Sequence, residues 1–349
     1  MRVLLTGSAG FVGRRVAMAL NAAGHEVIGV DMMLAAAHGP DAATPDGTLR
    51  LDLRERDGVD VALSGVDVVC HQAAMVGNGV DMQDLPDYAG HNDLGTAVLL
   101  AAMDRVGVRR LVLASSMVVY GEGRYRCARH GEVAPSARRA EDLDAGVFDP
   151  RCPECDRLLA WEPVPEAAPV RPRSIYAASK VAQEHYADAW CTMTDARCVA
   201  LRYHNVYGPG LPADTPYAGV AALFRSALGR GESPQVFEDG RQTRDFVHVD
   251  DVAAANIAAV ESVAGHARRV TAYNICSGTP FTIGDMASVL AAAHHGPVPV
   301  VTGRYRAADV RHIVASPDTA RAGLGFHART RPEDGLAALA SDRLRPTGR

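Results

Sequence analysis

Lysine is almost absent from this chain, since only Lys180 among the 36 lysine and arginine residues is a lysine. An excess of positive charge is also missing, because the formal net charge is −5 at pH 7 over 349 residues. Aromatic residues make up 5% of the chain. A nucleic-acid-binding face needs a basic patch, so this composition argues against a nucleic-acid partner.

Long apolar runs are missing as well. No run approaches the ~18 residues that a membrane-spanning helix needs, so we expect no membrane partner. Met1 and Arg2 lead directly into the apolar residues 3–5, which leaves no room for a signal peptide. Seven cysteines in a chain of this length do not suggest a disulfide scaffold. We therefore expect a cytoplasmic globular protein.

A glycine-rich turn opens the chain. Residues 3–6 read as a buried strand, Gly7, Gly10 and Gly13 follow at once, and residues 12–23 show a helical pattern. A second strand then ends in Asp31. This order is typical of a dinucleotide-binding unit, in which the glycines let the backbone approach a pyrophosphate. The free N–H groups at the helix start, at Phe11 and Val12, would bind the phosphates.

Asp31 stands where a carboxylate would accept the ribose hydroxyls of the cofactor. Met32 and Met33 follow it, with no arginine to hold a 2′-phosphate, which favours NAD over NADP. Ligands of parallel sheets bind at the carboxyl ends of the strands. On that basis we expect further cofactor contacts after later strands and at a helix start, from Asp52, Leu53, Gln72, Ala73, Ala74, Asn92, Ser115 and Tyr203.

Tyr176 precedes the single lysine by four residues, so both side chains lie on one face of a helix. A phenol titrates near pH ~10, and an adjacent cation lowers that pKa by favouring the phenolate. We therefore expect Tyr176 to exchange a proton near neutral pH. The alternative is an ordinary amphipathic helix in which the spacing arose by chance.

Residues 122–172 interrupt the strand and helix alternation and are rich in arginine, proline and acids. Within them, Cys127 and His130 form a Cys-x2-His pair, and Cys152 and Cys155 form a Cys-x2-Cys pair. Two such knuckles predict one tetrahedral zinc site, with a structural role because four protein ligands leave no open position. The alternative is a disordered surface insertion with incidental cysteines.

These motifs together resemble those of the extended short-chain dehydrogenase/reductases, and most closely the nucleotide-sugar 4-epimerases that act on UDP-galactose or UDP-glucuronate. The resemblance rests on the glycine turn, on residues 115–121 (Ser-Ser-Met-Val-Val-Tyr-Gly), on Tyr176 with Lys180, and on residues 244–248. It implies an α/β fold, with a Rossmann-type doubly wound parallel sheet, a smaller C-terminal α/β substrate region and a zinc-knuckle insertion.

The expected organisation has six parts. These are an NAD-binding Rossmann domain (1–121), the insertion with its predicted zinc site (122–172), a Rossmann continuation carrying the catalytic helix (173–210), a substrate region (211–243), a second Rossmann continuation (244–275) and a C-terminal substrate-binding region (276–343). We expect residues 344–349 to be a frayed tail.

The resemblance also assigns roles. It implies that Ser116, Tyr176 and Lys180 are catalytic, and that Tyr176 and Lys180 also contact NAD. It implies that Asn205, Arg244 and Arg306 hold the diphosphate of a nucleotide sugar, with Gln235 and Phe237 along the nucleoside and Asp309 beside them. It further implies a homodimer that pairs through the helices expected at 94–106 and 181–190.

The implied reaction is inversion of C4 in UDP-glucose/galactose or UDP-glucuronate through a transient 4-keto sugar, with NAD retained. Related dehydratases carry an Asp-Glu pair, and related decarboxylases a Glu, where this chain has Met117 and Val118. Neither apolar side chain can move a proton, which favours epimerisation over a dehydratase, decarboxylase or ketoreductase. Arg171 and Arg173 leave open a contact with a sugar carboxylate, and a dinucleotide-binding sensor without chemistry is the non-enzyme alternative.

Overall fold

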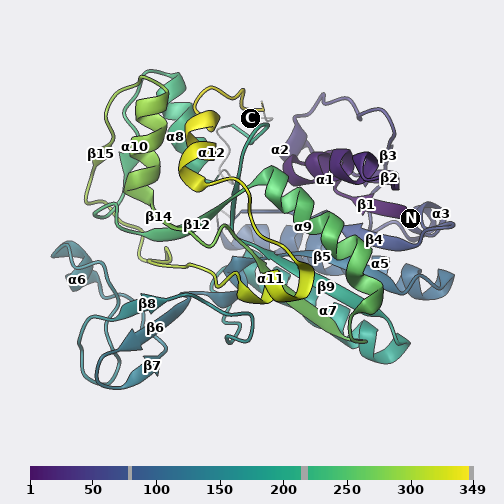
Figure 1. Cartoon of the computed structure of the whole chain (residues 1–349), viewed down its shortest axis with the longest axis horizontal. Coiled ribbons are helices and arrows are strands. Elements are labelled where there is room, and N and C mark those ends of the chain that lie inside the picture. Colours follow the sequence, from purple (N-terminus) through teal and green to yellow (C-terminus); the bar gives the residue numbers. More distant parts are fainter. Residues whose placement is uncertain (78–80, 214–218, 346–349) are drawn as a thin grey trace.

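The computed structural model describes residues 1–77, 81–213 and 219–345. A seven-stranded sheet forms its centre, in the order β13-β9-β5-β4-β1-β2-β3 (Figure 1). Every pairing in this sheet is parallel. In chain order the strands are β1 (Arg2–Thr6), β2 (Glu26–Asp31), β3 (Thr48–Arg50), β4 (Val68–His71), β5 (Arg110–Ser116), β9 (Arg197–Tyr203) and β13 (Val270–Ile275).

Helices cover both faces of the sheet, which explains why its inner strands are apolar along their length. One face carries α1 (Phe11–Ala22), α9 (Val249–Ser262) and α11 (Asp318–Leu324). The other carries α3 (Arg56–Ala62), α5 (Gly95–Val106) and α7 (Ile175–Thr194). Each layer of helices closes its own hydrophobic core against the sheet. The predicted Rossmann-type doubly wound sheet is therefore confirmed.

The strand order reverses between β1 and β4, and in such sheets the crevice at that reversal binds the ligand. Strand boundaries shift by small amounts from the predicted ones. The residue pattern at 49–53 favours a strand that reaches Leu53, whereas β3 ends at Arg50.

A smaller C-terminal region lies beyond the carboxyl ends of the strands. It holds a three-stranded sheet of β10 (Asn205–Tyr207), β12 (Thr243–His248) and β14 (Pro280–Thr282), and a strand pair of β11 (Gln235–Val236) with β15 (Val300–Val301). The helices α8 (Val220–Gly229), α10 (Ile283–Ala293) and α12 (Pro332–Leu339) pack around a third apolar core. Leu211, Pro212 and Gly219 of this region line one cavity together with the glycine turn.

The insertion forms a lobe that projects from the sheet at the lower left of Figure 1. Its antiparallel sheet has the order β7-β6-β8, from β7 (Gly131–Val133), β6 (Arg124–Cys127) and β8 (Ala160–Glu162), with one short helix, α6 (Ala140–Asp144). Its own core consists of Tyr125, Cys127, Cys152 and Leu159. A core this small, in which two members are cysteines, gives the lobe little intrinsic stability.

The expectation of a frayed C-terminal tail is wrong for its first two residues. Leu344 packs against the C-terminal core, and the backbone N–H of Arg345 donates to the carbonyl of Leu211 at 3.0 Å. The carbonyl of Arg345 in turn accepts from the N–H of Ala213 at 2.9 Å. Residues 346–349 lie outside the described part of the chain. Within the described part, no helix combines the length and apolar character needed to cross a membrane.

Candidate active site and metal cluster

The glycine turn forms one side of a cavity of about 360 Å³ at the sheet's switch point. Gly7 has a φ of +67°, and a side chain there would meet the backbone nitrogen of Ala73 at 2.7 Å. A Cβ on Gly13 would lie 2.0 Å from the carbonyl oxygen of Gly7. Both glycines are therefore required by geometry, and the backbone stays open for a ligand to approach. Gly10 caps α1, whose N-terminus lines the cavity with Phe11 and Val12.

Asp31 lines the same cavity at the end of β2. Its carboxylate accepts hydrogen bonds from the N–H groups of Ala9 (3.1 Å) and Met33 (2.9 Å) and lies 3.4 Å from the Nε2 atom of His38. Burial alone would raise the pKa of Asp31, but His38 and these N–H groups hold it below its ordinary value. The carboxylate is thus an ionised acceptor, as ribose hydroxyls require.

The structure separates the expected cofactor residues into two groups. The cavity is lined by Gly7, Gly10, Phe11, Val12, Gly13, Asp31, Asp52, Leu53, Gln72, Ala73 and Ala74. Asn92, Ser115 and Tyr203 lie outside its lining, and Asn92 and Tyr203 support the lining through hydrogen bonds. Asn92 exchanges two hydrogen bonds with the backbone of Met75, at 2.7 and 2.9 Å, and Tyr203 donates to the side-chain oxygen of Gln72 at 3.0 Å.

The side chain of Ser115 points away from the cavity and donates to the Oε1 atom of Glu184 at 2.5 Å. Glu184 pairs with Arg202 at 2.7 Å inside the protein. Ser115 and Ser116 are consecutive on β5, and successive side chains on a strand point to opposite faces. Of the two serines, Ser116 is therefore the one directed toward the candidate reaction centre, and a cofactor contact of Ser115 stays a prediction.

Ser116, Tyr176 and Lys180 come together at the carboxyl end of β5. The Tyr176 phenol lies close enough to Ser116 for the serine hydroxyl to lower the pKa of Tyr176. The ammonium of Lys180 donates to the carbonyl of Ala114 at 2.9 Å and lies 5.8 Å from the centre of the Tyr176 ring. The ring of Tyr88 packs on Tyr176 at 6.2 Å, and its hydroxyl donates to the carbonyls of Val76 and Gly77. Tyr88 thereby connects the cavity wall to the tyrosine.

The expected lowering of the tyrosine pKa is not found in the protein alone. Burial raises the pKa of Tyr176 to about 12, which the bond to Ser116 only partly offsets. Burial also lowers the pKa of Lys180 to about 7, against the charge of Glu184, which raises it. Burial disfavours both the phenolate and the ammonium. Lys180 is therefore less fully protonated than an exposed lysine, and it stabilises the phenolate less.

The C-terminal region brings Arg244, Asp309 and Arg306, three of the expected substrate residues, into one neighbourhood. The Arg244 guanidinium donates to the carbonyls of Val310 (2.5 Å) and Arg311 (3.0 Å), next to Asp309. Burial lowers the pKa of Arg244 and raises the pKa of Asp309. The Arg306 guanidinium stacks on the ring of Phe237, 5.3 Å from its centre.

Two further expected substrate residues flank this group. Asn205 stands at the start of β10, and its side-chain oxygen is buried without a hydrogen-bond partner in the described part of the chain. Gln235 is exposed and donates to the carbonyl of Ser233 at 3.1 Å. Asn205 is thus poised for a ligand, whereas Gln235 lies on the rim.

The arginines considered for a sugar carboxylate differ from each other. Arg173 forms an ion pair with Glu122, whose pKa burial raises. Arg171 is exposed and is held through its backbone N–H, which donates to the carbonyl of Val119 at 2.7 Å. The charge of Arg173 is therefore already balanced by a carboxylate of this chain.

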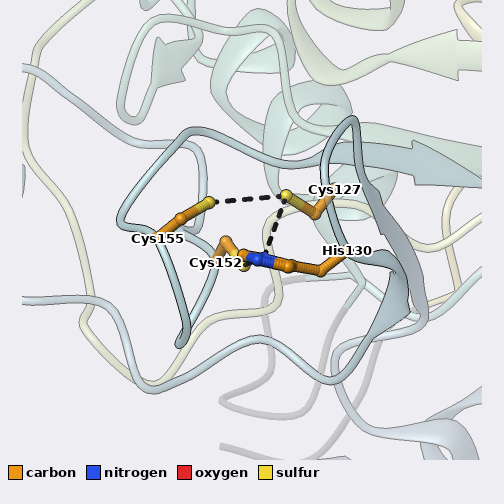
Figure 2. Close-up of side chains that lie close together, drawn as sticks. All are labelled: Cys127, His130, Cys152 and Cys155. Atoms are coloured by element: carbon orange, nitrogen blue, oxygen red, sulfur yellow. Dashed lines mark hydrogen bonds between the residues drawn. The ribbon is translucent and has the colours of Figure 1, made fainter.

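Cys127, His130, Cys152 and Cys155 form one cluster, whose ligand atoms all lie within 4.8 Å of one another (Figure 2). The Sγ atoms of Cys127 and Cys155 are 3.6 Å apart, and the Nδ1 atom of His130 lies 3.8 and 3.4 Å from the Sγ atoms of Cys127 and Cys152. Tetrahedral zinc requires separations of about 3.8 Å between sulfurs and about 3.5 Å between sulfur and nitrogen. The donor set and its spacing fit zinc.

Each of the two knuckles is followed by a residue with a positive φ. Gly131 follows the first with a φ of +74°, and Asp156 follows the second with a φ of +61°, a conformation that favours glycine. The N–H groups of Arg129 and His130 lower the pKa of the Cys127 thiol to about 6, which favours the thiolate that binds a metal. The two sequence pairs therefore close on each other as predicted.

Several residues of the site escaped the sequence analysis. Arg345 lines the cofactor cavity and donates to the carbonyls of Ala9 (3.0 Å) and Ala37 (3.2 Å). Its Nε atom is buried with no partner among the described residues. His38 and the buried Glu184 and Arg202 pair were also missed. No local motif marks any of them, because each reaches the site only through the fold.

Comparison with known proteins identifies the family. The sequence profile of the NAD dependent epimerase/dehydratase family matches residues 3–144 and 160–276. The chain belongs to this family. The predicted resemblance to extended short-chain dehydrogenase/reductases is thereby confirmed, and the protein is an enzyme of an NAD-dependent family. The break in the match, residues 145–159, contains Cys152 and Cys155.

Relatives within the family are similar over nearly their whole length. A dTDP-L-rhamnose 4-epimerase from Burkholderia thailandensis is 33% identical, covering 97% of this chain and 93% of the relative. A UDP-glucose 4-epimerase from Mycolicibacterium smegmatis is 30% identical, with coverage of 97% and 96%. The structure of Thermus thermophilus UDP-glucose 4-epimerase in complex with NAD is 30% identical, with a TM-score of 0.75 and coverage of 97% and 98%.

The residues of this family member fit NAD. The glycine turn leaves space that any Cβ would fill, Asp31 offers an ionised acceptor, and the buried Nε atom of Arg345 lacks a partner among the described residues. These three features match a ligand that combines a pyrophosphate with ribose hydroxyls.

Proposed function

We propose that the enzyme inverts C4 of a nucleotide-diphosphate sugar through a transient 4-keto sugar. The observation that carries the proposal is the placement of Tyr176, Ser116 and Lys180 at the carboxyl end of β5, beside the glycine-lined cavity. Relatives of about one-third identity that bear 4-epimerase names support the same chemistry.

NAD, when bound, supplies a reversible hydride acceptor and a positive ring near the tyrosine. Tyr176 exchanges the proton of the C4 hydroxyl, and Ser116 donates a hydrogen bond to the same oxygen. Lys180 stabilises the phenolate, and a phenolate in turn favours the charged form of Lys180. Because the protein alone keeps Tyr176 protonated, with a pKa of about 12, proton transfer begins only once the site is filled.

The substrate side supports an anionic nucleotide. Arg244 and Arg306 supply forked cationic donors suited to a diphosphate. The unpartnered Oδ1 atom of Asn205 adds a neutral acceptor, which suits a hydroxyl of the ligand. The proposed sugars are those of UDP-glucose/galactose and UDP-glucuronate, together with dTDP-L-rhamnose, after the named relative. Because Arg173 already pairs with Glu122, it is less suited to bind the carboxylate of UDP-glucuronate.

A proton NMR time course of the pure enzyme with each of UDP-glucose, UDP-glucuronate and dTDP-L-rhamnose tests the function. No cofactor or reductant is added. Inversion at C4 in one of them supports the proposal and names the sugar. A dehydrated, decarboxylated or reduced product would instead establish the alternative of a dehydratase, decarboxylase or ketoreductase, and would show that Met117 and Val118 do not decide the outcome.

We also infer that Cys127, His130, Cys152 and Cys155 hold one structural zinc ion. Their spacing supports it, and four protein ligands leave no position for a reacting water. Elemental analysis of the purified protein should find one zinc per chain. Cys155→Ser should lose that zinc, whereas Cys191→Ala, which removes a buried thiol outside the cluster, should keep it. Equal zinc contents in the two variants would refute the site.

Two further expectations stay predictions. The homodimer would form through α5 and α7, which pack side by side on one face of the sheet. A cytoplasmic location remains an expectation from the sequence.

A further inference from the structure

The inserted lobe contacts several parts of the chain, and one of them is the segment 304–312 of the C-terminal region. Asp149 of the lobe accepts hydrogen bonds from Arg311 Nε at 2.8 Å and lies 3.0 Å from His312 Nε2. The Tyr125 hydroxyl accepts from the N–H of His312 at 3.2 Å, and the ring of Trp161 stacks on the His312 ring at 6.1 Å. Three separate parts of the lobe therefore converge on two adjacent residues.

Arg311 is the centre of this contact and is only 1% exposed. Besides Asp149, it donates to Glu238 at 2.8 Å and to both carboxylate oxygens of Asp239, at 2.7 and 2.9 Å. Asp149 accepts the Nε proton of Arg311, and its loss would leave that buried donor without this partner, which is costly, although Glu238 and Asp239 would still balance the charge. The position of Arg311 therefore depends on the lobe that supplies Asp149.

Arg138 makes a second connection from the lobe. It pairs with Glu238 at 2.5 Å, with both side chains 3% exposed. Its other terminal nitrogen donates to the carbonyls of Arg306 (3.1 Å) and Asp309 (2.7 Å). Glu238 thus bridges Arg138 and Arg311, and it does so with a φ of +54°, a strained backbone conformation for a residue with a side chain.

The same segment carries the residues proposed to bind the substrate. Arg306 and Asp309 belong to it, and Arg244 is held by the carbonyls of Val310 and Arg311. Phe237, on which Arg306 stacks, precedes Glu238. The forked donors for a diphosphate are therefore positioned by a network whose other end lies in the inserted lobe.

The shape of the lobe depends on its cluster. Its core has four buried members, and Cys127 and Cys152 are two of them. Asp149 leads into the second knuckle, where the N–H of Cys152 donates to the carbonyl of Arg157 at 2.8 Å and that of Leu159 donates to the carbonyl of Pro150 at 2.9 Å. A metal that closes the knuckles therefore fixes the backbone that presents Asp149.

We propose that the zinc lobe is a positioning device for the nucleotide-diphosphate site, acting through Asp149 and Arg138 on Arg311, Glu238 and the segment 304–312. Asp149 is a positioning residue in this scheme, since it touches no substrate group itself. Loss of zinc or of Asp149 weakens binding of the nucleotide sugar and leaves the NAD cavity unchanged. The inference rests on the proposed function for the identity of the ligand.

The test uses UDP as a probe and compares wild type with Asp149→Ala and with Glu141→Ala, a matched change at an exposed acid of the same lobe. Calorimetry should give a UDP Kd at least fivefold higher for Asp149→Ala, with zinc content and NAD occupancy equal to wild type. On the sugar that inverts, KM should rise while kcat stays within twofold. Glu141→Ala should match wild type in every measurement.

Unchanged UDP affinity in Asp149→Ala would overturn the inference. Joint loss of UDP affinity, NAD occupancy and zinc would overturn it too, since that pattern indicates general destabilisation. A measurement on wild type needs no variant: removal of zinc by a chelator should increase amide hydrogen exchange in residues 304–312 and leave residues 3–31 unchanged. Equal exchange with and without zinc, or a wild type that holds no zinc, would contradict the proposal.

Failure of the proposed function gives a different result. If wild type binds no UDP, the nucleotide-sugar assignment is wrong, whereas the exchange measurement still decides whether the lobe positions residues 304–312.

Discussion

Among single residues, the burial of Lys180 and Tyr176 dominates the chemistry of the site. Helical spacing put both side chains on one face, and that part was predictable from sequence. Their pKa values were not, because burial moves each against its charged form. A local motif reports which groups meet, whereas the surrounding packing determines how readily they ionise.

Replacing Tyr176 by phenylalanine should lower kcat roughly 10²–10⁴-fold, because the variant loses the group that exchanges the C4 proton. Tyr186→Phe on the same helix is the matched control, since that side chain is 44% exposed. Steady-state kinetics on the sugar identified by NMR provides the comparison. Similar kcat values for the two variants would refute the catalytic assignment of Tyr176.

Lys180 should also leave a signature in the pH dependence of stability. Burial lowers its pKa from 10.5 to about 7, so between those pH values the unfolded chain binds a proton that the folded, cofactor-free protein releases. The free energy of unfolding should therefore rise with pH across this window. Urea unfolding at pH 7 and pH 10 should show this rise for wild type relative to Lys180→Met, and parallel pH profiles would contradict it.

Ser115 and Arg345 show what a local sequence pattern does not specify. Ser115 and Ser116 are chemically alike, and only the alternation of β5 directs one toward Glu184 and the other toward Tyr176. Arg345 is separated from the glycine turn by most of the chain, so nothing local links it to the cavity.

Among elements, the C-terminal segment that contains Arg345 contributes that side chain to the lining of the cavity at the glycine turn. Backbone hydrogen bonds with Leu211 and Ala213 fix the segment, and the guanidinium contacts the carbonyls of Ala9 and Ala37. The turn and helix α1 behind it were predictable, because their glycine spacing is a local pattern. The segment was not, since its composition resembles that of a frayed end.

Arg345→Ala should therefore bind NAD more weakly. Loss of one hydrogen bond from a charged group is worth about 1.5 kcal/mol, which corresponds to roughly tenfold in Kd. Arg343→Ala, which changes an exposed arginine two residues earlier, should keep wild-type affinity. Calorimetric titration with NAD after removal of endogenous cofactor measures both, and equal affinities would exclude Arg345 from the cofactor site.

In the whole molecule, three parts of the chain meet: the parallel sheet, the C-terminal region and the inserted lobe. The C-terminal sheets and helices lie beyond one end of the parallel sheet, and the inserted lobe projects beside them (Figure 1). The cavity at the glycine turn is lined by residues of the parallel sheet and by Leu211, Pro212 and Gly219. Sequence patterns predicted the sheet and the metal cluster, because both depend on short motifs. The contact between the lobe and the segment 304–312 was not predictable, since Asp149 and Arg311 meet only in the folded chain.

The predicted homodimer also belongs to this scale. Size-exclusion chromatography with light scattering should give twice the 36.9 kDa of one chain. Pairing through α5 and α7 should protect the amide hydrogens of both helices from exchange more strongly at high than at low protein concentration. A mass equal to one chain at micromolar concentration would contradict the dimer.

In the proposed reaction, hydride leaves C4 of the sugar and returns to the same carbon from the other side. The most direct test uses the sugar nucleotide that the enzyme inverts, labelled with deuterium at C4, in ordinary water. We predict that the inverted product retains the deuterium at C4, because the retained NAD would accept deuteride from C4 and return the same deuteride to C4. Replacement of that deuterium by solvent hydrogen, or its loss with a dehydrated or decarboxylated product, would contradict the claim.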